Sequence, residues 1–245
     1  MLAVWTILIA GSLLVWAWIC HVLLQNPRQD LETGLIWHAM RVYSTLFHRL
    51  EIRGGEHLPK SRTPGSLIIV SNHTAGVDPV LIQAASLFEI RWLMAQDMRH
   101  PALEWAWRFG RIIFVDRTGD AMGAREAIRH VKVGGVLGIF PEGGIERPAR
   151  HILPFQAGVG MIIKRTQAPV LPVVVTGTPI ADRAWTSLMR RSHSVITFHP
   201  VLHYPAGESA AAIAKDLEER FVELTGWPSA RGRGVHAEAS AATSV

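Results

Sequence analysis

The sequence predicts an α/β fold, with a largely parallel β-sheet flanked by helices and preceded by an N-terminal membrane-associated helix or helix pair. Two observations support this class. From about residue 51 onwards, short runs rich in β-branched residues alternate with helical patterns, an order typical of a parallel sheet with crossover helices. Before that point, residues 1–24 contain no Asp, Glu, Lys or Arg. The 245 residues suffice for one α/β domain with a large core.

The uncharged segment 1–24 predicts membrane attachment. As an α-helix it would extend roughly 36 Å, enough to cross a hydrocarbon layer of about 30 Å. A signal peptide fits less well, because no basic stretch precedes the apolar run and no A-x-A-like site follows it. Trp5, Trp16 and Trp18 suit anchoring at a membrane interface. The pattern fits a helix that spans the bilayer and equally a helix that lies within one leaflet.

Basic residues after this segment predict its orientation. Arg28, Arg41, Arg49 and Arg53 all lie on its C-terminal side, so the positive-inside tendency places the bulk of the protein on the cytoplasmic face. Leucine and aromatic residues within residues 27–49 approximate the stripe of a second helix. This second helix is expected to rest either on the membrane surface or on the domain that follows.

We therefore divide the chain into membrane-anchoring helices at 1–49, an α/β domain at 50–228 and a disordered tail at 229–245. The tail is rich in Ser, Ala, Gly and Arg, a composition that forms no packed core. The predicted strands span residues 51–53, 66–71, 91–95, 112–115, 136–140, 170–176 and 195–201. The predicted helices of the domain span residues 79–88, 101–109, 120–133, 155–165 and 209–224.

Composition narrows the classes of function. The formal net charge of +5 and the pI near 10.0 suit an anionic partner, such as a membrane surface, a nucleic acid or a phosphorylated substrate. Nucleic-acid binding is disfavoured because the basic residues are scattered and no binding signature is present. The histidines show no zinc-binding spacing, and no P-loop occurs. The single cysteine, Cys20, permits no intrachain disulfide, which fits a reducing cytoplasm. No pattern specifies an oligomeric state.

The stretch after the second predicted strand is the most informative part of the sequence. It begins Asn72-His73, turns at Gly76 and ends with Asp78-Pro79. Aspartate followed by proline is a typical helix start, with the acid as N-cap and proline at the first helical position. The carboxylate can fold back onto one ring nitrogen of the histidine and hold it as a general base. The alternative is that Asp78 is only a cap and His73 only a polar residue at a strand end.

Three further segments carry polar groups or prolines at strands. Asp116-Arg117 ends one apolar run, and the planar guanidinium suits a phosphate, although for this motif alone a solvent-exposed ion pair is the favoured explanation. Glu142-Gly143-Gly144 ends the next strand. Glu142 could bind a hydroxyl group or orient its neighbours, and the glycines let backbone N–H groups approach a ligand, although an ordinary Gly-Gly turn is the default interpretation of this segment alone. The run 168–175 is an apolar strand interrupted by prolines.

Because ligands bind beyond the carboxyl ends of strands in open α/β sheets, we expect His73, Asp116 and Glu142 to line one binding site there. Taken in order, these segments resemble the glycerophospholipid acyltransferase family, of the 1-acyl-glycerol-3-phosphate acyltransferase or lysophospholipid acyltransferase type. That family has an N-H-x4-D block, a strand ending in D-R, an F-P-E-G-T-R block and a Pro-containing apolar strand. The similarity spans about residues 52–176.

The resemblance implies an enzyme with His73 as the base that takes a proton from the acceptor hydroxyl and Asp78 as the residue that orients it. The hydroxyl would attack an acyl thioester carried by coenzyme A or by acyl carrier protein, with no metal and no other cofactor. The resemblance implies substrate binding by Asn72, Arg117, Glu142, Gly143 and Gly144. Direct transfer fits the residues, because no G-x-S-x-G elbow is present and Cys20 lies in the apolar segment.

Two departures from the family pattern concern the acceptor. Ile145 stands where the family commonly has a phosphate-binding arginine, and Arg147 or Arg150 is a candidate replacement. The second block also has one extra residue between Gly110 and the Asp-Arg pair.

The expected function is a membrane-bound O-acyltransferase that converts 1-acyl-glycerol 3-phosphate into phosphatidate in phospholipid biosynthesis. The first alternative keeps the chemistry but changes the acceptor to another lysophospholipid or a lyso-aminolipid. The second is a membrane lipid-binding protein without catalysis, in which His73 is structural. The expected partners are membrane lipid, a lysophospholipid acceptor and the thioester donor.

Overall fold

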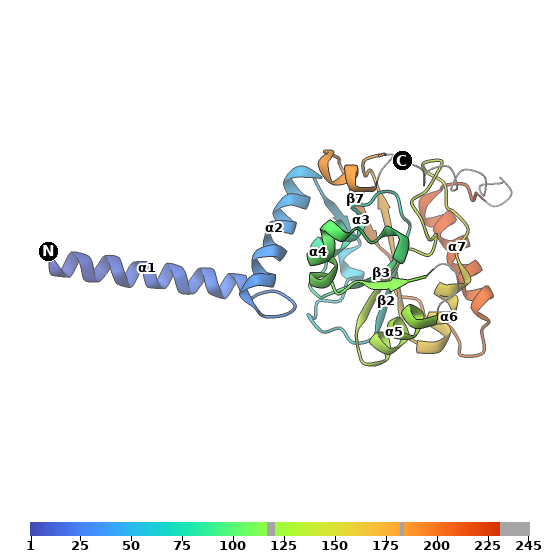
Figure 1. The fold of residues 1–245 in the computed structure, drawn as a ribbon, viewed down its shortest axis with the longest axis horizontal. Helices are drawn as coiled ribbons and strands as arrows, with labels where there is room; N and C mark the ends of the chain where they lie inside the picture. The colour runs from blue at the N-terminus through green and yellow to red at the C-terminus, as the bar shows by residue number, and fades with distance from the viewer. Residues whose placement is uncertain (117–120, 182–183, 231–245) are drawn as a thin grey trace.

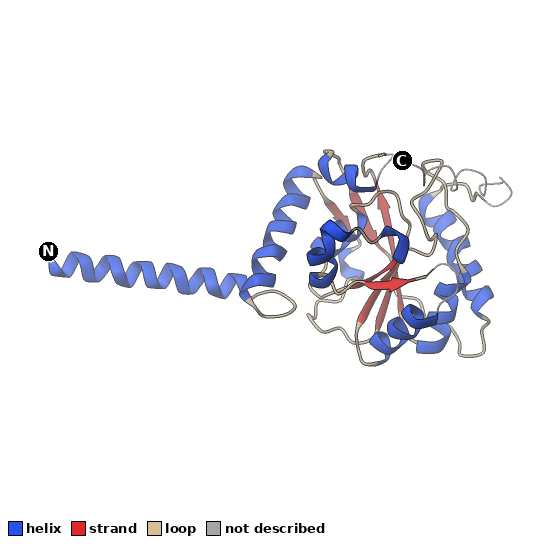
Figure 2. Ribbon diagram, in the orientation of Figure 1, coloured by secondary structure: helices blue, strands red, loops and turns tan. Residues whose placement is uncertain are grey.

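The computed structural model describes residues 1–116, 121–181 and 184–230 (Figure 1). Within them, a seven-stranded sheet lies between two layers of helices (Figure 2). The strands are β1 (Glu51–Arg53), β2 (Leu67–Ser71), β3 (Arg91–Ala95), β4 (Ile113–Val115), β5 (Val136–Ile139), β6 (Val170–Thr176) and β7 (Val195–Phe198). Their order across the sheet is β1-β7-β6-β2-β5-β3-β4, and every neighbouring pair is parallel except β6 and β7. The predicted α/β class with a largely parallel sheet is confirmed.

The helices cover both faces of this sheet. The α-helices are α1 (Leu2–Leu23), α2 (Leu31–Phe47), α3 (Asp78–Ala85), α4 (Glu104–Phe109), α5 (Ala121–Lys132), α6 (Ala157–Thr166) and α7 (Ala210–Thr225). The 3-10 helices are η1 (Gly55–His57), η2 (Gln96–Met98), η3 (Pro101–Leu103) and η4 (Ala184–Met189). One core cluster joins the sheet to α5, α6 and α7, and a second joins the opposite face to α3.

The central strand β2 contributes side chains to both hydrophobic cores. Ile68 and Val70 point into the α5–α7 core, whereas Leu67 and Ile69 point into the α3 core. All four side chains are buried. Each contributes about 1.5–3 kcal/mol through burial, so the strand that leads to Asn72 is held from both sides.

The boundaries of several predicted elements differ from the structure. Helix α3 ends at Ala85, short of the predicted 88, because Ser86 is extended and its Oγ donates to the carbonyl of Ile82. The predicted helix 101–109 is divided into η3 and α4. Strand β7 ends at Phe198 rather than at 201, because Pro200 has no N–H to donate. The reversed direction of β1 and β7 was not predicted.

Helix α1 projects away from the α/β domain, and α2 lies between them (Figure 1). The corner between the two helices is tightly packed. A side chain in place of Gly34 would put its Cβ only 2.0 Å from the carbonyl oxygen of Leu23. The amide of Asn26 donates to the carbonyls of Leu23 and Asp30, each at 2.7 Å. The carboxylate of Asp30 caps α2 by accepting from the N–H of Thr33 at 2.7 Å.

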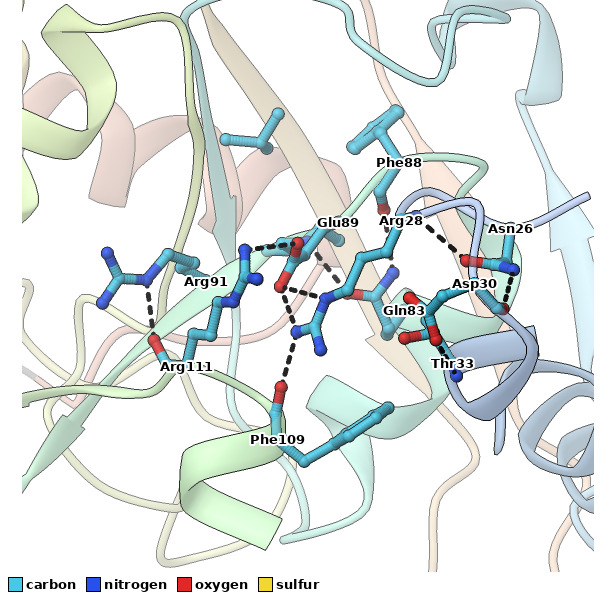
Figure 3. Close-up of polar contacts among 12 residues, drawn as sticks. Asn26, Arg28, Asp30, Thr33, Gln83, Phe88, Glu89, Arg91, Phe109 and Arg111 are labelled. Carbon is cyan, nitrogen blue, oxygen red and sulfur yellow. Dashed lines mark hydrogen bonds and ion pairs between the residues drawn. The ribbon is translucent and has the colours of Figure 1, made fainter. Parts of the chain in front are cut away.

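The inner face of α2 packs against the α/β domain, which is one of the two positions that the sequence allowed for this helix. Trp37 and Ser44 are buried on this face, and the Tyr43 hydroxyl donates to the carbonyl of Leu188 at 2.6 Å. The segment between α1 and α2 is attached through Arg28 (Figure 3). Its guanidinium forms an ion pair with Glu89, donates to the Phe109 carbonyl and lies 4.8 Å from the Phe109 ring centre. The opposite face of α2 exposes Leu31, Leu35, Val42 and Leu46.

Candidate active site

Asn72 holds the end of β2 against β6. Its side chain is fully buried. Its Oδ1 accepts from the N–H of Val175 at 2.8 Å and its Nδ2 donates to the carbonyl of the same residue at 2.9 Å. The side-chain amide thus takes the place of a backbone peptide in the ladder, and the backbone of residues 72–73 is released to leave the sheet. This geometry gives Asn72 a structural role at the end of β2, and the substrate contact that the resemblance implies stays a prediction.

His73 and Asp78 come together as predicted. The Nδ1 of His73 lies 2.9 Å from Oδ2 of Asp78. The same oxygen accepts from the backbone N–H groups of Thr74 at 2.7 Å and Ala75 at 2.9 Å, and Oδ1 accepts from the Thr74 hydroxyl at 3.1 Å. Asp78 is the first residue of α3 and Val77 is the N-cap, so the predicted cap role is wrong. The carboxylate points back into the preceding loop instead of forward into the helix.

These hydrogen bonds explain how a fully buried carboxylate is tolerated. Its oxygens have four donors, which offset the loss of hydration. The carboxylate fixes the proton of the His73 ring on Nδ1, and the lone pair is then on Nε2. Among the described residues, Nε2 has no hydrogen-bond partner, and 18% of the His73 side chain is exposed. The ring is therefore held on one side and accessible on the other, as a general base requires.

A stack of three rings sets the plane of the imidazole. The ring of Phe140 is 4.1 Å from that of His73 at 18°, and Trp92 continues the stack at 4.9 Å and 11°. Gly138 of β5 makes room for the indole, because a Cβ there would lie 2.4 Å from the Trp92 ring. Sequence reasoning missed this stack. The only signal was the aromatic residue that opens the Pro-Glu-Gly-Gly segment.

Glu142 lies beneath His73 rather than at an open surface. Its Oε1 accepts from the backbone N–H of His73 at 2.9 Å and its Oε2 from that of Leu153 at 3.1 Å. Burial raises the pKa of this carboxyl to about 8. Both oxygens are engaged and only 5% of the residue is exposed, so Glu142 holds the backbone of His73 in place. Of the two roles that the sequence leaves open for Glu142, the structure shows the orientation of a neighbour, and the contact with the acceptor stays a prediction.

The two glycines after Glu142 differ in what they offer a ligand. Gly143 has a φ of 71°, which favours glycine, and its N–H donates to the Phe140 carbonyl at 3.2 Å within the turn. The N–H of Gly144 makes no hydrogen bond to any described residue. Of the two, Gly144 is the donor left for an anion or a carbonyl oxygen.

A protein-family model described as Acyltransferase matches residues 49–176, from just before β1 to the end of β6. The chain belongs to the glycerophospholipid acyltransferase family. The matched segment ends at the residue predicted from the motifs and contains both His73 and Asp78.

Relatives and a solved structure agree with the family. The 1-acyl-sn-glycerol-3-phosphate acyltransferase of Limnanthes douglasii is 26% identical over 159 residues, which cover 63% of this chain and 54% of the relative. The chain thus spans about half the length of that relative. The N-acylphosphatidylethanolamine synthase of Arabidopsis thaliana is 30% identical over 200 residues, covering 75% of this chain and 68% of the relative. The 1-acyl-sn-glycerophosphate acyltransferase of Thermotoga maritima shares the fold, with a TM-score of 0.62 and 24% identity over 80% of this chain and 82% of that one.

The segment that departs from the family pattern contains two arginines with different surroundings. The guanidinium of Arg147 donates to the carbonyls of Glu146 at 2.6 Å and Ala181 at 2.5 Å, so it is used within the fold. Arg150 is exposed, and its guanidinium forms no hydrogen bond or ion pair with the described residues. Arg150 is therefore the better of the two candidates to replace the arginine missing at Ile145.

The predicted phosphate ligand Arg117 lies outside the described residues. The strand before it, β4, ends at Val115 and is separated from β2 by β5 and β3. At the usual strand spacing this is roughly 14 Å across the sheet. The structure thus brings together His73, Asp78, Glu142 and the glycine pair. The carboxyl end of β4, which leads to Asp116, lies along the same edge of the sheet but at its outermost strand.

Proposed function

We propose that this chain is an O-acyltransferase that moves a fatty acyl group from a thioester to the hydroxyl of 1-acyl-glycerol 3-phosphate and so makes phosphatidate. The observation that carries the proposal is the 2.9 Å contact between Nδ1 of His73 and the buried Asp78, with the ring open on its other side. The family supports acyl transfer, and curated relatives named 1-acyl-sn-glycerol-3-phosphate acyltransferases support the acceptor.

The chemistry follows from this geometry. Nε2 of His73 takes the proton of the acceptor hydroxyl as its oxygen attacks the thioester carbonyl, and a tetrahedral oxyanion forms. The N–H of Gly144 is the donor that we assign to this oxyanion. Collapse of the intermediate breaks the carbon–sulfur bond, and the imidazolium returns its proton to the thiolate. Asp78 stabilises the imidazolium between the two proton transfers. The donor leaves as the free thiol of coenzyme A or acyl carrier protein.

We also propose that the protein sits on the cytoplasmic face of a membrane. Helix α1 is long and apolar enough to span a bilayer, and none of its hydrophobic window is buried. The exposed face of α2, defined by Leu31, Leu35, Val42 and Leu46, continues this apolar surface beside the domain. A lipid acceptor could then reach His73 without leaving the bilayer surface.

A second acceptor class has specific support. Ile145 replaces the expected arginine, and one relative is named N-acylphosphatidylethanolamine synthase, so an amine of a phospholipid is a candidate acceptor. The same base would remove a proton from the ammonium group or from the tetrahedral adduct.

The test is a panel of acceptors offered to the purified full chain in mixed micelles with a long-chain acyl-CoA or acyl carrier protein. The panel contains 1-acyl-glycerol 3-phosphate, lysophosphatidylethanolamine, lysophosphatidylcholine and phosphatidylethanolamine. We expect phosphatidate as the main product. Turnover of another acceptor in preference to lysophosphatidate would transfer the proposal to that lipid. Lipid binding without turnover of any acceptor would support the non-catalytic alternative.

A further inference from the structure

A second buried glutamate, Glu146, lies behind His73 and belongs to none of the motif blocks. It is 4% exposed. Its backbone N–H donates to the carbonyl oxygen of His73 at 2.8 Å, and its Oε1 accepts from the backbone N–H of Arg150 at 2.8 Å. Its Oε2 is buried and has no hydrogen-bond partner among the described residues. Buried polar atoms are seldom left unpaired, so a carboxyl at this position calls for an explanation.

Hydrogen bonds from the loop after β5 hold both backbone polar groups of His73. The N–H of His73 is held by the Glu142 carboxyl, and its carbonyl is held by the N–H of Glu146. The two glutamate side chains also reach the returning part of the loop, Glu142 at Leu153 and Glu146 at Arg150. The Glu146 side chain therefore closes the turn 146–150, and this turn aims the N–H of residue 146 at His73.

The surroundings indicate that the oxygen acceptor matters more than the charge. Asp78 and Glu142 are the nearby carboxyls, and the guanidinium of Arg147 donates to the Glu146 carbonyl rather than to its side chain. Burial raises the pKa of Glu146 to about 7, with a further contribution from the negative charge of Asp78. A neutral carboxyl still offers a carbonyl oxygen to the N–H of Arg150.

We propose that Glu146 is a positioning residue for the general base: its side chain closes the turn 146–150, and the turn holds the His73 backbone so that the ring meets the acceptor hydroxyl. This inference rests on the proposed role of His73. Small displacements of a reacting group are costly, since a shift of about 1 Å can lower a rate by about 10²-fold.

Two substitutions and one control test the role. Glu146→Ala removes the acceptor for the Arg150 N–H, whereas Glu146→Gln keeps an oxygen and the volume. The control is Glu218→Ala, because Glu218 is also buried and accepts a backbone N–H of the same loop, that of Phe155 at 2.9 Å. In steady-state assays at a temperature where every variant is folded by circular dichroism, kcat of Glu146→Ala should fall about 10- to 100-fold with KM changed by less than about 3-fold. Glu146→Gln should retain kcat within about 3-fold, and so should Glu218→Ala.

Hydrogen exchange of the peptide covering residues 72–79 gives a readout that needs no acceptor. We expect faster exchange there in Glu146→Ala and wild-type exchange in Glu146→Gln and Glu218→Ala. Wild-type kcat and exchange in Glu146→Ala would overturn the inference, and so would a Gln variant as impaired as the Ala variant. If the wild-type chain turns over no acceptor, the proposed function fails, while the exchange comparison still decides whether Glu146 holds the base.

Discussion

Replacing Asp78 by Asn separates the charge of the buried carboxylate from its hydrogen bonding. The amide oxygen can occupy the position of Oδ2 and still accept from Thr74, Ala75 and the ring of His73. The amide NH2 then meets the Thr74 hydroxyl, which can turn to accept. The loop should therefore keep its shape, and the free energy of unfolding of Asp78→Asn should lie within about 1 kcal/mol of the wild-type value.

The rate should respond much more strongly. At an effective dielectric of about 20, unit charges about 4 Å apart attract by about 4 kcal/mol. The imidazolium of the transition state loses this attraction, and the dipole of the amide oxygen recovers a part of it. A net loss of about 3 kcal/mol corresponds to a fall in kcat of about 10²-fold, since about 1.4 kcal/mol is one decade.

The assay is acyl transfer at saturating lysophosphatidate, with urea unfolding of the same preparations. Asp216→Asn is the matched control, because Asp216 pairs with Arg220 in α7, away from the site. Asp78→Asn with wild-type kcat would refute the reasoning. A low kcat accompanied by a loss of several kcal/mol of stability would show that the carboxylate acts mainly on the fold.

Three other results are expected. Asn72→Ala leaves the buried N–H and carbonyl of Val175 unpaired and should lower the free energy of unfolding in urea by about 2–5 kcal/mol. Wild-type stability would contradict the structural role assigned to these two hydrogen bonds. Gly138→Ala places a Cβ against the Trp92 ring and should lower both stability and kcat. An unaffected kcat would show that the ring stack does not orient His73 for catalysis. The folded-state pKa of Glu142 is raised from 4.5 to about 8, so the folded protein binds this proton more tightly than the unfolded chain does. The free energy of unfolding should therefore fall by roughly 5 kcal/mol as pH rises through this window. Glu142→Gln should lose less stability over the same range, and an unchanged slope would contradict the buried titration.

Much of the fold was accessible from the sequence because local patterns decide it. The runs that form β2, β5 and β6 are buried on both faces, and such strands appear in a sequence as continuous apolar segments. The pairing of His73 with Asp78 was also predictable, because a strand end, a turn and a helix start lie within a few residues of one another. The direction of β7 depends on contacts between distant segments, and no local pattern encodes it.

The roles of the other site residues were less accessible for the same reason. Asn72 meets Val175, and Glu142 meets Leu153, only once the chain has folded. A polar residue beside a histidine is read from sequence as a ligand contact, but its partner here is the backbone of another segment. Glu146 had no motif to mark it, and its burial became visible only in the structure.

The most direct test of the central claim is the first-turnover rate of acyl transfer by His73→Ala, measured with preloaded thioester and saturating acceptor. His203→Ala is the matched control, because His203 is exposed and lies beyond β7. We predict that the rate of His73→Ala falls at least about 10²-fold while His203→Ala transfers at the wild-type rate. A His73→Ala variant that completes its first turnover as fast as the wild type would contradict the assignment of this imidazole as the base.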